Sequence, residues 1–301
     1  MSTTPGVVCL EEAQRQQIAT LVNNHTGIRL PPEKHQLIEG RLRKRLRELG
    51  LPDFASYCDY LSAQEAEHQE GEFEQLIDAL TTNKTDFFRE ADHFTLLADK
   101  VLPQWQQDIG VDQRPLRIWC AGCSTGEEAY SLAMVLSEYA QQHPGFQFQI
   151  LATDISHQVL RHARQAIYPH ALIEVIPPQL RHKYLLRSRD SGRQEVRMTA
   201  QIRQRVQFGH LNLMDEQYQL PEKQDVIFCR NVLIYFERHV QEQVIRRLCN
   251  ESRPGGILFL GHSESIHNMQ LPLTQFAPTT YVIDGCVSPV GGSGKATGPA
   301  A

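Results

Sequence analysis

The sequence predicts an α/β fold, built as a doubly wound sheet, with an all-helical domain before it and a small antiparallel β-subdomain inserted into it. Three observations lead to this prediction. Apolar strand patterns alternate with helical patterns over residues 116–284. Residues 10–80 show helical spacing and no strand-like alternation of any length. Residues 168–209 break the strand–helix rhythm of the larger domain.

The amino-terminal region divides at its turn signals. Residues 10–80 are interrupted at Leu30-Pro31-Pro32, Gly50-Leu51-Pro52 and Glu70-Gly71, which predicts a small domain of several helices. Residues 81–115 are expected to form a helical connecting segment. Residues 285–301 are rich in glycine, alanine, serine and proline, which predicts a disordered tail.

The first strand pattern, Leu116–Ala121, runs into a small-residue turn and a helix that opens with Glu127 and Glu128. Counted from Gly122, the later glycines of a dinucleotide fingerprint would fall on Ser124 and Glu127, and no Gly-Lys-Ser/Thr follows for a P-loop. Carboxylates at such a turn would repel a phosphate and favour a cationic ligand. S-adenosylmethionine, which is cationic and has no phosphate, fits better than NAD or ATP. The alternative is a tight connection without a ligand.

Two further strand patterns end on polar residues. Phe146–Ser156 carries Asp154 at its end, where a carboxylate can accept hydrogen bonds from both ribose hydroxyls. The alternative for this aspartate is an N-cap of the next helix. Asp225–Ile234 is interrupted by Arg230 and Asn231 where a sheet opens its ligand crevice, which indicates residues that line a site.

The fourth strand pattern and the insertion complete the larger domain. Gly255–His262 follows a Pro-Gly-Gly turn and closes the series of strands. Within residues 168–209, Tyr184–Arg187 and Glu195–Met198 flank the turn-rich residues 188–192, which predicts a hairpin.

Composition excludes several classes of protein. The net charge of −5 argues against a general nucleic-acid binder. No stretch approaches the ~20 apolar residues of a membrane span, and Glu11 and Glu12 stand where a signal peptide would be apolar, so we expect a cytoplasmic protein. Seven irregularly spaced cysteines favour reduced thiols. Cys120 and Cys123 fit small buried thiols better than a zinc or redox pair, and no metal site is predicted.

Glu39–Glu48 predicts a helix with one strongly cationic face. Ile38, Leu42, Leu46 and Leu49 recur at helical spacing on the other face. Such a cationic face is either merely solvated or a docking surface for an acidic partner. The residues of the candidate docking surface are Arg41, Arg43, Lys44, Arg45 and Arg47.

Five segments occur in order along the chain: Thr81–Glu90, Ser124–Glu128, Thr153–Ile155, Asn212-Leu213 and Cys229–Phe236. Together they closely resemble the motifs of the chemotaxis receptor methyltransferases (CheR type), over roughly residues 10–284. The resemblance implies a Rossmann-like, S-adenosylmethionine-dependent methyltransferase domain. It also implies a protein-glutamate O-methyltransferase that methylates glutamate side chains on the cytoplasmic helices of bacterial chemoreceptors.

The resemblance also implies the residues that contact the cofactor. By match of motif these are Asn83, Thr85, Arg89, Glu127, Asp154, Asn212, Leu213, Arg230 and Asn231. In this interpretation Arg89 pairs with the cofactor's carboxylate, Glu127 holds its ammonium and Asn231 lines the adenine or methionine end. Spacing alone selects neither Asn83, Thr85 nor Arg89, and the alternative for Arg89 is a surface position on a helix.

Methyl transfer to a glutamate carboxylate needs little help from a catalytic residue. A glutamate with a pKa of ~4.3 is already ionised at pH 7, so no general base is needed and alignment in a dry site should supply most of the catalysis. Tyr235 is the candidate for orienting the substrate carboxylate. The alternative is a core tyrosine whose hydroxyl is satisfied by backbone.

Partners and competing functions complete the predictions. Some family members hold a receptor carboxyl-terminal peptide as an extra strand, and Arg187, Arg189, Arg193 and Arg197 would suit an acidic one. The alternative is that these charges only protect a sheet edge.

We expect a monomer. A methyltransferase for small molecules is one competing function, and nucleic acid is disfavoured because Arg-Asn-Val-Leu replaces an Asp/Asn-Pro-Pro-Tyr/Phe run. A catalytically idle, cofactor-binding scaffold is the other.

Overall fold

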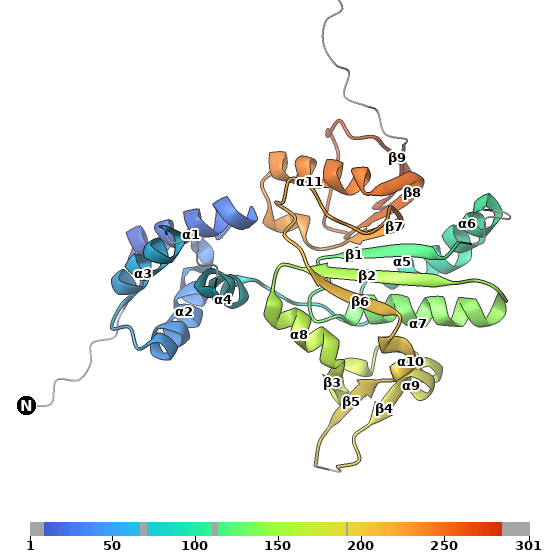
Figure 1. The fold of residues 1–301 in the computed structure, drawn as a ribbon, viewed down its shortest axis with the longest axis horizontal. Coiled ribbons are helices and arrows are strands. Elements are labelled where there is room, and N and C mark those ends of the chain that lie inside the picture. The colour runs from blue at the N-terminus through green and yellow to red at the C-terminus, as the bar shows by residue number, and fades with distance from the viewer. Residues whose placement is uncertain (1–8, 67–70, 110–113, 191, 285–301) are drawn as a thin grey trace, which may run out of the picture.

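The computed structural model describes residues 9–66, 71–109, 114–190 and 192–284. Its amino-terminal domain is a group of helices beside the larger α/β domain (Figure 1). The helices are α1 (Glu12–Thr26), the 3₁₀ turn η1 (Pro32–Lys34), α2 (His35–Leu49), α3 (Phe54–Ala66) and α4 (Gly71–Leu80). The prediction of an all-helical domain is therefore confirmed.

Helix α2 shows why this region folds as helices. Ile38, Leu42 and Leu46 recur every four residues and are buried along one face of α2. They pack with Phe54 and Tyr57 in a core that is distinct from the two cores of the larger domain. These apolar side chains explain why the segment folds as an amphipathic helix.

Residues 81–109 pack as part of the larger domain. They form α5 (Ala91–Leu96), a π-helical stretch η2 (Leu97–Val101) and α6 (Leu102–Ile109). Phe87, Phe94 and Leu97 are almost completely buried in the larger domain's core. The segment expected as a connection is thus anchored on the sheet domain by its aromatic and aliphatic side chains.

The main sheet has the strand order β6-β2-β1-β7-β8-β10-β9. Its strands are β1 (Leu116–Ala121), β2 (Phe148–Asp154), β6 (Val206–His210), β7 (Gln224–Cys229), β8 (Ser252–Leu260), β9 (Leu273–Ala277) and β10 (Thr280–Ile283). Strands β6, β2, β1, β7 and β8 pair in parallel. Strand β10 pairs antiparallel with β8 on one side and with β9 on the other.

Helices cover both faces of this sheet. Figure 1 shows α11 (Arg238–Asn250) on one face, and α7 (Glu127–Gln142) and α8 (His157–Gln165) on the other. Since β2 and β7 flank β1 on opposite sides, the chain order reverses at β1. The crevice at the carboxyl ends of these three strands is where doubly wound folds bind ligands.

The insertion is a small antiparallel sheet with the order β3-β5-β4. It contains β3 (Ile167–Pro169), η4 (His170–Ile173), α9 (Pro178–Tyr184), β4 (Leu185–Arg187), β5 (Glu195–Met198) and α10 (Ala200–Arg203). The expected range 168–209 needs adjustment, because β6 pairs in parallel with β2 and belongs to the main sheet. Tyr184, expected in the hairpin, ends α9 and is buried.

Within the described residues, no helix combines the length and hydropathy that crossing a bilayer requires. The predicted tail, residues 285–301, lies outside the described residues.

Candidate active site

A pocket of about 1050 Å³, including its open mouth, lies between the helical domain and the carboxyl ends of β1, β2 and β7. Eight of the nine predicted cofactor contacts line it, together with Tyr235. The side formed by the sheet domain comprises Gly122, Ser124, Glu128, Thr153, Asp154, Ile155, Leu211, Asn212, Leu213, Arg230, Asn231, Val232, Tyr235 and Phe236. The opposite side comprises Thr26, Ile28, Arg29, Leu30, Lys34, Leu80, Thr81, Thr82, Asn83, Lys84, Thr85 and Arg89.

The turn after β1 shapes the floor of this pocket. Gly122 has a φ of +85°, and a Cβ there would lie 2.4 Å from Cγ2 of Val232. Only glycine avoids both the unfavourable conformation and the collision. Ser124 then fixes the loop, because its hydroxyl donates to the carbonyl of Asn83 at 2.9 Å. This hydrogen bond therefore connects the turn after β1 to the segment that follows α4.

Asp154 ends β2 and holds the same turn from the other side. Its carboxylate accepts hydrogen bonds from the backbone N–H of Ser124 at 2.8 Å and of Ser156 at 3.0 Å. The N-cap of α8 is Ser156, whose hydroxyl accepts from Val159. A carboxylate has about four acceptor positions, so Asp154 can also accept from ribose hydroxyls. Burial raises the pKa of Asp154, although the backbone N–H groups oppose this effect.

The two glutamates at the start of α7 have different environments. Glu127, predicted to hold the ammonium group, does not line the pocket in this structure. It is 3% exposed, and Thr125 donates a hydrogen bond to its carboxylate at 2.6 Å. Burial raises the pKa of Glu127 to about 7. Glu128 is the glutamate on the pocket wall, and it accepts from Nη1 of Arg230 at 2.9 Å and from the Cys120 thiol at 2.8 Å.

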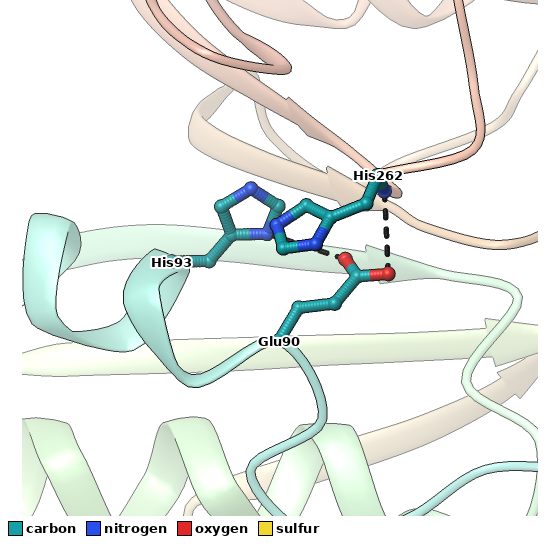
Figure 2. Close-up of side chains that lie close together, drawn as sticks. All are labelled: Glu90, His93 and His262. Carbon is teal, nitrogen blue, oxygen red and sulfur yellow. Dashed lines mark hydrogen bonds and ion pairs between the residues drawn. The ribbon is translucent and has the colours of Figure 1, made fainter.

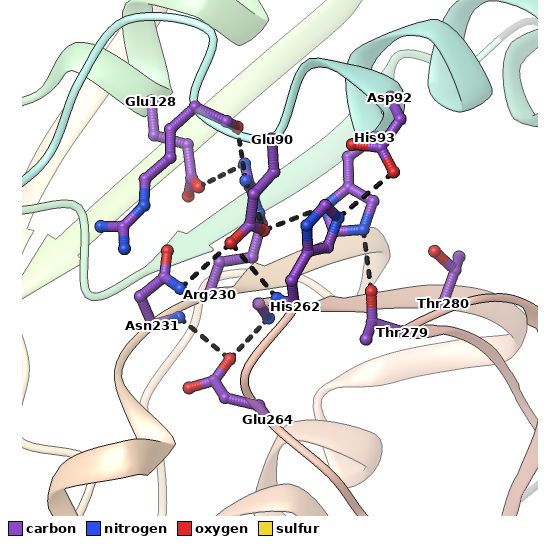
Figure 3. Close-up of polar contacts among 12 residues, drawn as sticks. Glu90, Asp92, His93, Glu128, Arg230, Asn231, His262, Glu264, Thr279 and Thr280 are labelled. Atoms are coloured by element: carbon purple, nitrogen blue, oxygen red, sulfur yellow. Dashed lines mark hydrogen bonds and ion pairs between the residues drawn. The ribbon is translucent and has the colours of Figure 1, made fainter.

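Arg230 is the centre of a buried ionic network (Figure 3). Its side chain is 0% exposed, and Nη2 lies 2.8 Å from Oε2 of Glu90. Glu90 also accepts from Nδ2 of Asn231 at 3.2 Å. Burial alone would raise the pKa of Glu90, but hydrogen bonding and attraction from Arg230 outweigh it and lower that pKa to about 2. Arg230, predicted to contact the cofactor, thus forms its ion pairs with Glu90 and Glu128.

Glu264 orders the backbone beside this network. Its carboxylate accepts from the N–H groups of Asn231 at 2.9 Å, Val232 at 2.8 Å and Leu233 at 2.7 Å. Asn231 has a φ of +60°, a left-handed conformation that asparagine tolerates better than most residues. Glu264 therefore positions the residues that follow β7 without lining the pocket itself.

Tyr235 and Arg89 lie on the pocket wall. Tyr235 ends the 3₁₀ turn η5 (Leu233–Tyr235) and is partly exposed, with its hydroxyl 3.5 Å from the carbonyl of Thr82. Burial raises its pKa. The hydroxyl contacts a backbone carbonyl, as the core-tyrosine alternative expects, but the side chain is not fully buried, and the orienting role of Tyr235 stays a prediction. The Arg89 guanidinium donates to the carbonyl of Lys84 at 3.1 Å.

Asn212 ties the helical domain to the sheet domain. Its side-chain amide donates to the carbonyl of His25 at 2.7 Å, and its carbonyl oxygen accepts from Met214 N–H at 2.9 Å. The adjacent Leu213 is 7% exposed and contributes to a core of the sheet domain.

Sequence reasoning missed the part of the wall that the helical domain supplies. Thr26, Arg29 and Lys34 line the pocket, and the Lys34 ammonium lies 5.5 Å from the centre of the Tyr235 ring. No local pattern marks these residues, because they meet the sheet domain only in the folded chain. Glu90 could have been selected from the sequence, because it is the last residue of the motif segment Thr81–Glu90.

The candidate docking helix is less free than predicted. Nη1 of Arg41 donates to the carbonyls of residues 79, 80 and 81 at 3.1, 3.2 and 2.9 Å, which satisfies the carboxyl end of α4. Arg43 forms an ion pair with Glu39 one turn earlier. These two arginines support the domain itself.

The other three members of the face differ in exposure. Arg45 binds Glu72 through two hydrogen bonds, and the Glu72 side chain is only 2% exposed. Lys44, by contrast, is 77% exposed, and Arg47 is also exposed. A docking surface on this helix therefore rests mainly on Lys44 and Arg47.

Comparisons with known proteins cover nearly the whole chain. Residues 83–282 match the family model described as CheR methyltransferase, SAM binding domain, and residues 13–81 match CheR methyltransferase, all-alpha domain. The chain is 37% identical over 276 residues to the chemotaxis protein methyltransferase of Escherichia coli, covering 92% of each chain. It is 38% identical to that of Borreliella burgdorferi, covering 88% of this chain and 92% of the relative. It is also 38% identical to chemotaxis protein methyltransferase 2 of Pseudomonas aeruginosa, covering 88% and 91%.

Proposed function

The chain belongs to the CheR family of chemotaxis methyltransferases, and from this premise we propose that the pocket between its two domains is where a receptor glutamate is methylated. The enzyme transfers the methyl group of S-adenosylmethionine to glutamate side chains of chemoreceptors, forming methyl esters. We propose that it does so in the cytoplasm, as a monomer.

The observation that supports this use of the pocket is the fit between its donors and the cofactor. Gly122 keeps the floor clear, since any Cβ would collide with Val232. Asp154 offers acceptor positions for ribose hydroxyls beside the turn, and Glu128, paired with Arg230, adds a carboxylate to the wall. These groups suit a cationic nucleoside and are a poor match for the pyrophosphate of NAD.

The chain's residues act by binding and orientation. When bound, S-adenosylmethionine supplies an electrophilic methyl group on a sulfonium. Arg89 would pair with its carboxylate, Asp154 with its ribose, and Asn231 would line the remaining wall. Tyr235 would orient the receptor carboxylate from the mouth, where Arg29 and Lys34 add positive charge. The glutamate is ionised at neutral pH, so exclusion of water and alignment are the main tasks.

The function is tested by incubating the full chain with cofactor labelled on the methyl group and with receptor-bearing membranes. We expect label in base-labile glutamate esters of the receptors. A scaffold without activity would bind S-adenosylhomocysteine and transfer nothing. Label in nucleic acid or small molecules, with none in receptors, would favour the competing methyltransferase functions.

Asp154→Ala is expected to weaken binding of S-adenosylhomocysteine by about 1.5–3 kcal/mol, because the charge-assisted hydrogen bonds to the ribose are lost. Isothermal calorimetry measures this directly. Asp190→Ala, at a side chain that is 65% exposed in the insertion, is the matched control and should bind normally. Unchanged affinity in folded Asp154→Ala would overturn the ribose assignment.

Replacing both Lys44 and Arg47 by alanine is expected to slow receptor methylation roughly twofold to tenfold and to reduce its sensitivity to salt, because these exposed charges steer the encounter with acidic receptor helices. Cofactor affinity should not change. The control removes two other exposed charges, Lys223 and Arg246, whose side chains are 51% and 47% exposed. Equal methylation rates in the two double variants would mean that the helix face is only solvated.

The inserted sheet is expected to bind an acidic receptor carboxyl-terminal peptide. Arg187, Arg189, Arg193 and Arg197 are all exposed there, and β4 and β3 form the two edges of the sheet. Fluorescence titration should give micromolar affinity, weakened by Arg187→Glu and by amidation of the peptide's terminal carboxylate. If no receptor peptide binds at ~100 μM, the four arginines serve only to protect the edges of this sheet from pairing with other chains.

A further inference from the structure

Glu90, His93 and His262 converge behind the pocket wall (Figure 2). Glu90 immediately precedes α5, His93 lies on α5, and His262 follows β8. One ligand atom from each residue lies within 4.8 Å of those of the other two. Glu90 and His93 are close in sequence, but His262 is distant from both, so no spacing motif identifies the three residues together.

His93 carries the most informative atom of this cluster. Its side chain is 1% exposed, and Nε2 lies 3.0 Å from Oγ1 of Thr279. Among the described residues, its Nδ1 has no hydrogen-bond partner, and the carboxylate of Glu90 that it faces is 3.6 Å away. Leaving a buried polar atom unsatisfied costs about 1–3 kcal/mol, which an added ligand would offset. Burial lowers the pKa of His93 to about 4, so the ring is neutral at pH 7.

The outer sides of both imidazoles are held by neighbouring groups. Asp92 lies 3.2 Å from Nε2 of His262, just as Thr279 lies beside Nε2 of His93 (Figure 3). Nδ1 of each ring is therefore the nitrogen left for an inner ligand. A carboxylate or hydroxyl on the far nitrogen is the arrangement that orients histidine ligands in metal sites.

Charge and access also favour a cation. Glu90 and Glu128 lie beside the guanidinium of Arg230, and Asp92 lies beside His262, so the carboxylates around the cluster outnumber this arginine. The His262 side chain is 48% exposed, which gives an ion a route from solvent.

We propose that Glu90, His93 and His262 bind a divalent ion of the zinc class, through two imidazole nitrogens and one carboxylate, with water completing the coordination. The same ion acts on the cofactor pocket. Glu90 also holds Arg230 and Asn231, and an ion that draws on its carboxylate weakens this hold. Bound zinc therefore lowers cofactor affinity, and bound cofactor lowers zinc affinity by the same factor.

The site is tested with Zn²⁺ and Co²⁺ on chelator-treated full-length protein. Calorimetry should show one strong Zn²⁺ site per chain, and Co²⁺ should give d–d absorption without a thiolate-to-metal charge-transfer band, which excludes cysteine ligands. His262→Ala, at an exposed position, should weaken Zn²⁺ binding more than about tenfold. His239→Ala, 69% exposed on α11, should bind as the wild type does. Equal Zn²⁺ affinity in the two variants, or no binding by the wild type at ~100 μM, would overturn the site.

The coupling has its own measurement. Titration of S-adenosylhomocysteine with and without saturating Zn²⁺ should show weaker binding with the ion in the wild type and in His239→Ala, but no difference in His262→Ala. A Zn²⁺ effect of equal size in all three proteins would contradict coupling through this cluster.

Discussion

Arg230→Met is expected to lower the free energy of unfolding by about 3–5 kcal/mol, because it leaves two carboxylates in the protein interior without their cation. The side chains of Glu90 and Glu128 are 12% and 13% exposed and lie within 2.9 Å of the guanidinium. Methionine keeps much of the length and apolar body of arginine, so the packing against Phe94 and Phe228 is largely retained. The loss is therefore mainly electrostatic.

Urea unfolding at pH 7 measures this loss. Arg193→Met is the matched control, because Arg193 is 69% exposed and pairs with an exposed aspartate at 3.6 Å, so it should shift stability by less than about 0.5 kcal/mol. The double variant Arg230→Met/Glu90→Gln should recover part of the loss. A single Arg230→Met variant within about 1 kcal/mol of the wild type would show that the network is not stabilising.

The same network predicts a pH dependence. The pKa of Glu90 is lowered from its ordinary value of 4.5 to about 2 in the folded protein. Between these values the unfolded chain binds more protons, so the contribution of Glu90 is present above pH 4.5 and is lost as the pH falls towards 2. Arg230→Met removes this dependence. The stability difference between wild type and variant should consequently narrow over that window.

The sequence predicts the strands well because their signal is local. Apolar runs ending in polar residues place β2 and β7, and Asp154 and Arg230 stand at or just after their ends in the structure. The first βα turn is also predictable, since Gly122 and the acidic helix start are adjacent in the chain. A prediction can thus locate the crevice from short segments alone.

The remaining parts depend on helical phase and on distant contacts. Glu127 and Glu128 differ by about 100° around α7, which puts one against Thr125 and the other on the pocket wall. A sequence pattern does not fix that phase when both residues are acidic. The proposed metal-binding cluster is beyond pattern analysis for the same reason, because His93 and His262 meet only when α5 packs against the end of β8.

The boundary of the insertion shows a further limit. The strand β6 follows directly after α10, and nothing between them marks the return to the main sheet. Its partner β2 lies more than fifty residues earlier in the chain. Pairing between parallel strands this far apart is decided by the crossover and not by the residues of the short strand itself.

The cationic face of α2 gives the second large effect. Arg45→Ala is expected to destabilise the helical domain by about 3–5 kcal/mol, because it strands the buried carboxylate of Glu72. That carboxylate accepts two hydrogen bonds from Arg45, one of them 2.8 Å long, and a third from the Tyr57 hydroxyl at 2.9 Å. Of these three hydrogen bonds to Glu72, the one from Tyr57 would remain in the variant.

Lys44→Ala is a sharp control for this prediction, because it removes the same charge from the next position of the same helix. Lys44 is 77% exposed and its ion pair with Glu48 is 3.8 Å long, so the expected change is within about 0.5 kcal/mol. Thermal and urea unfolding compare the two variants directly. Because removing both members of a buried pair costs less than removing one, Arg45→Ala/Glu72→Gln should be more stable than Arg45→Ala. If Arg45→Ala matches Lys44→Ala in stability but slows receptor methylation, Arg45 serves docking after all, and the structural role assigned to it here is wrong.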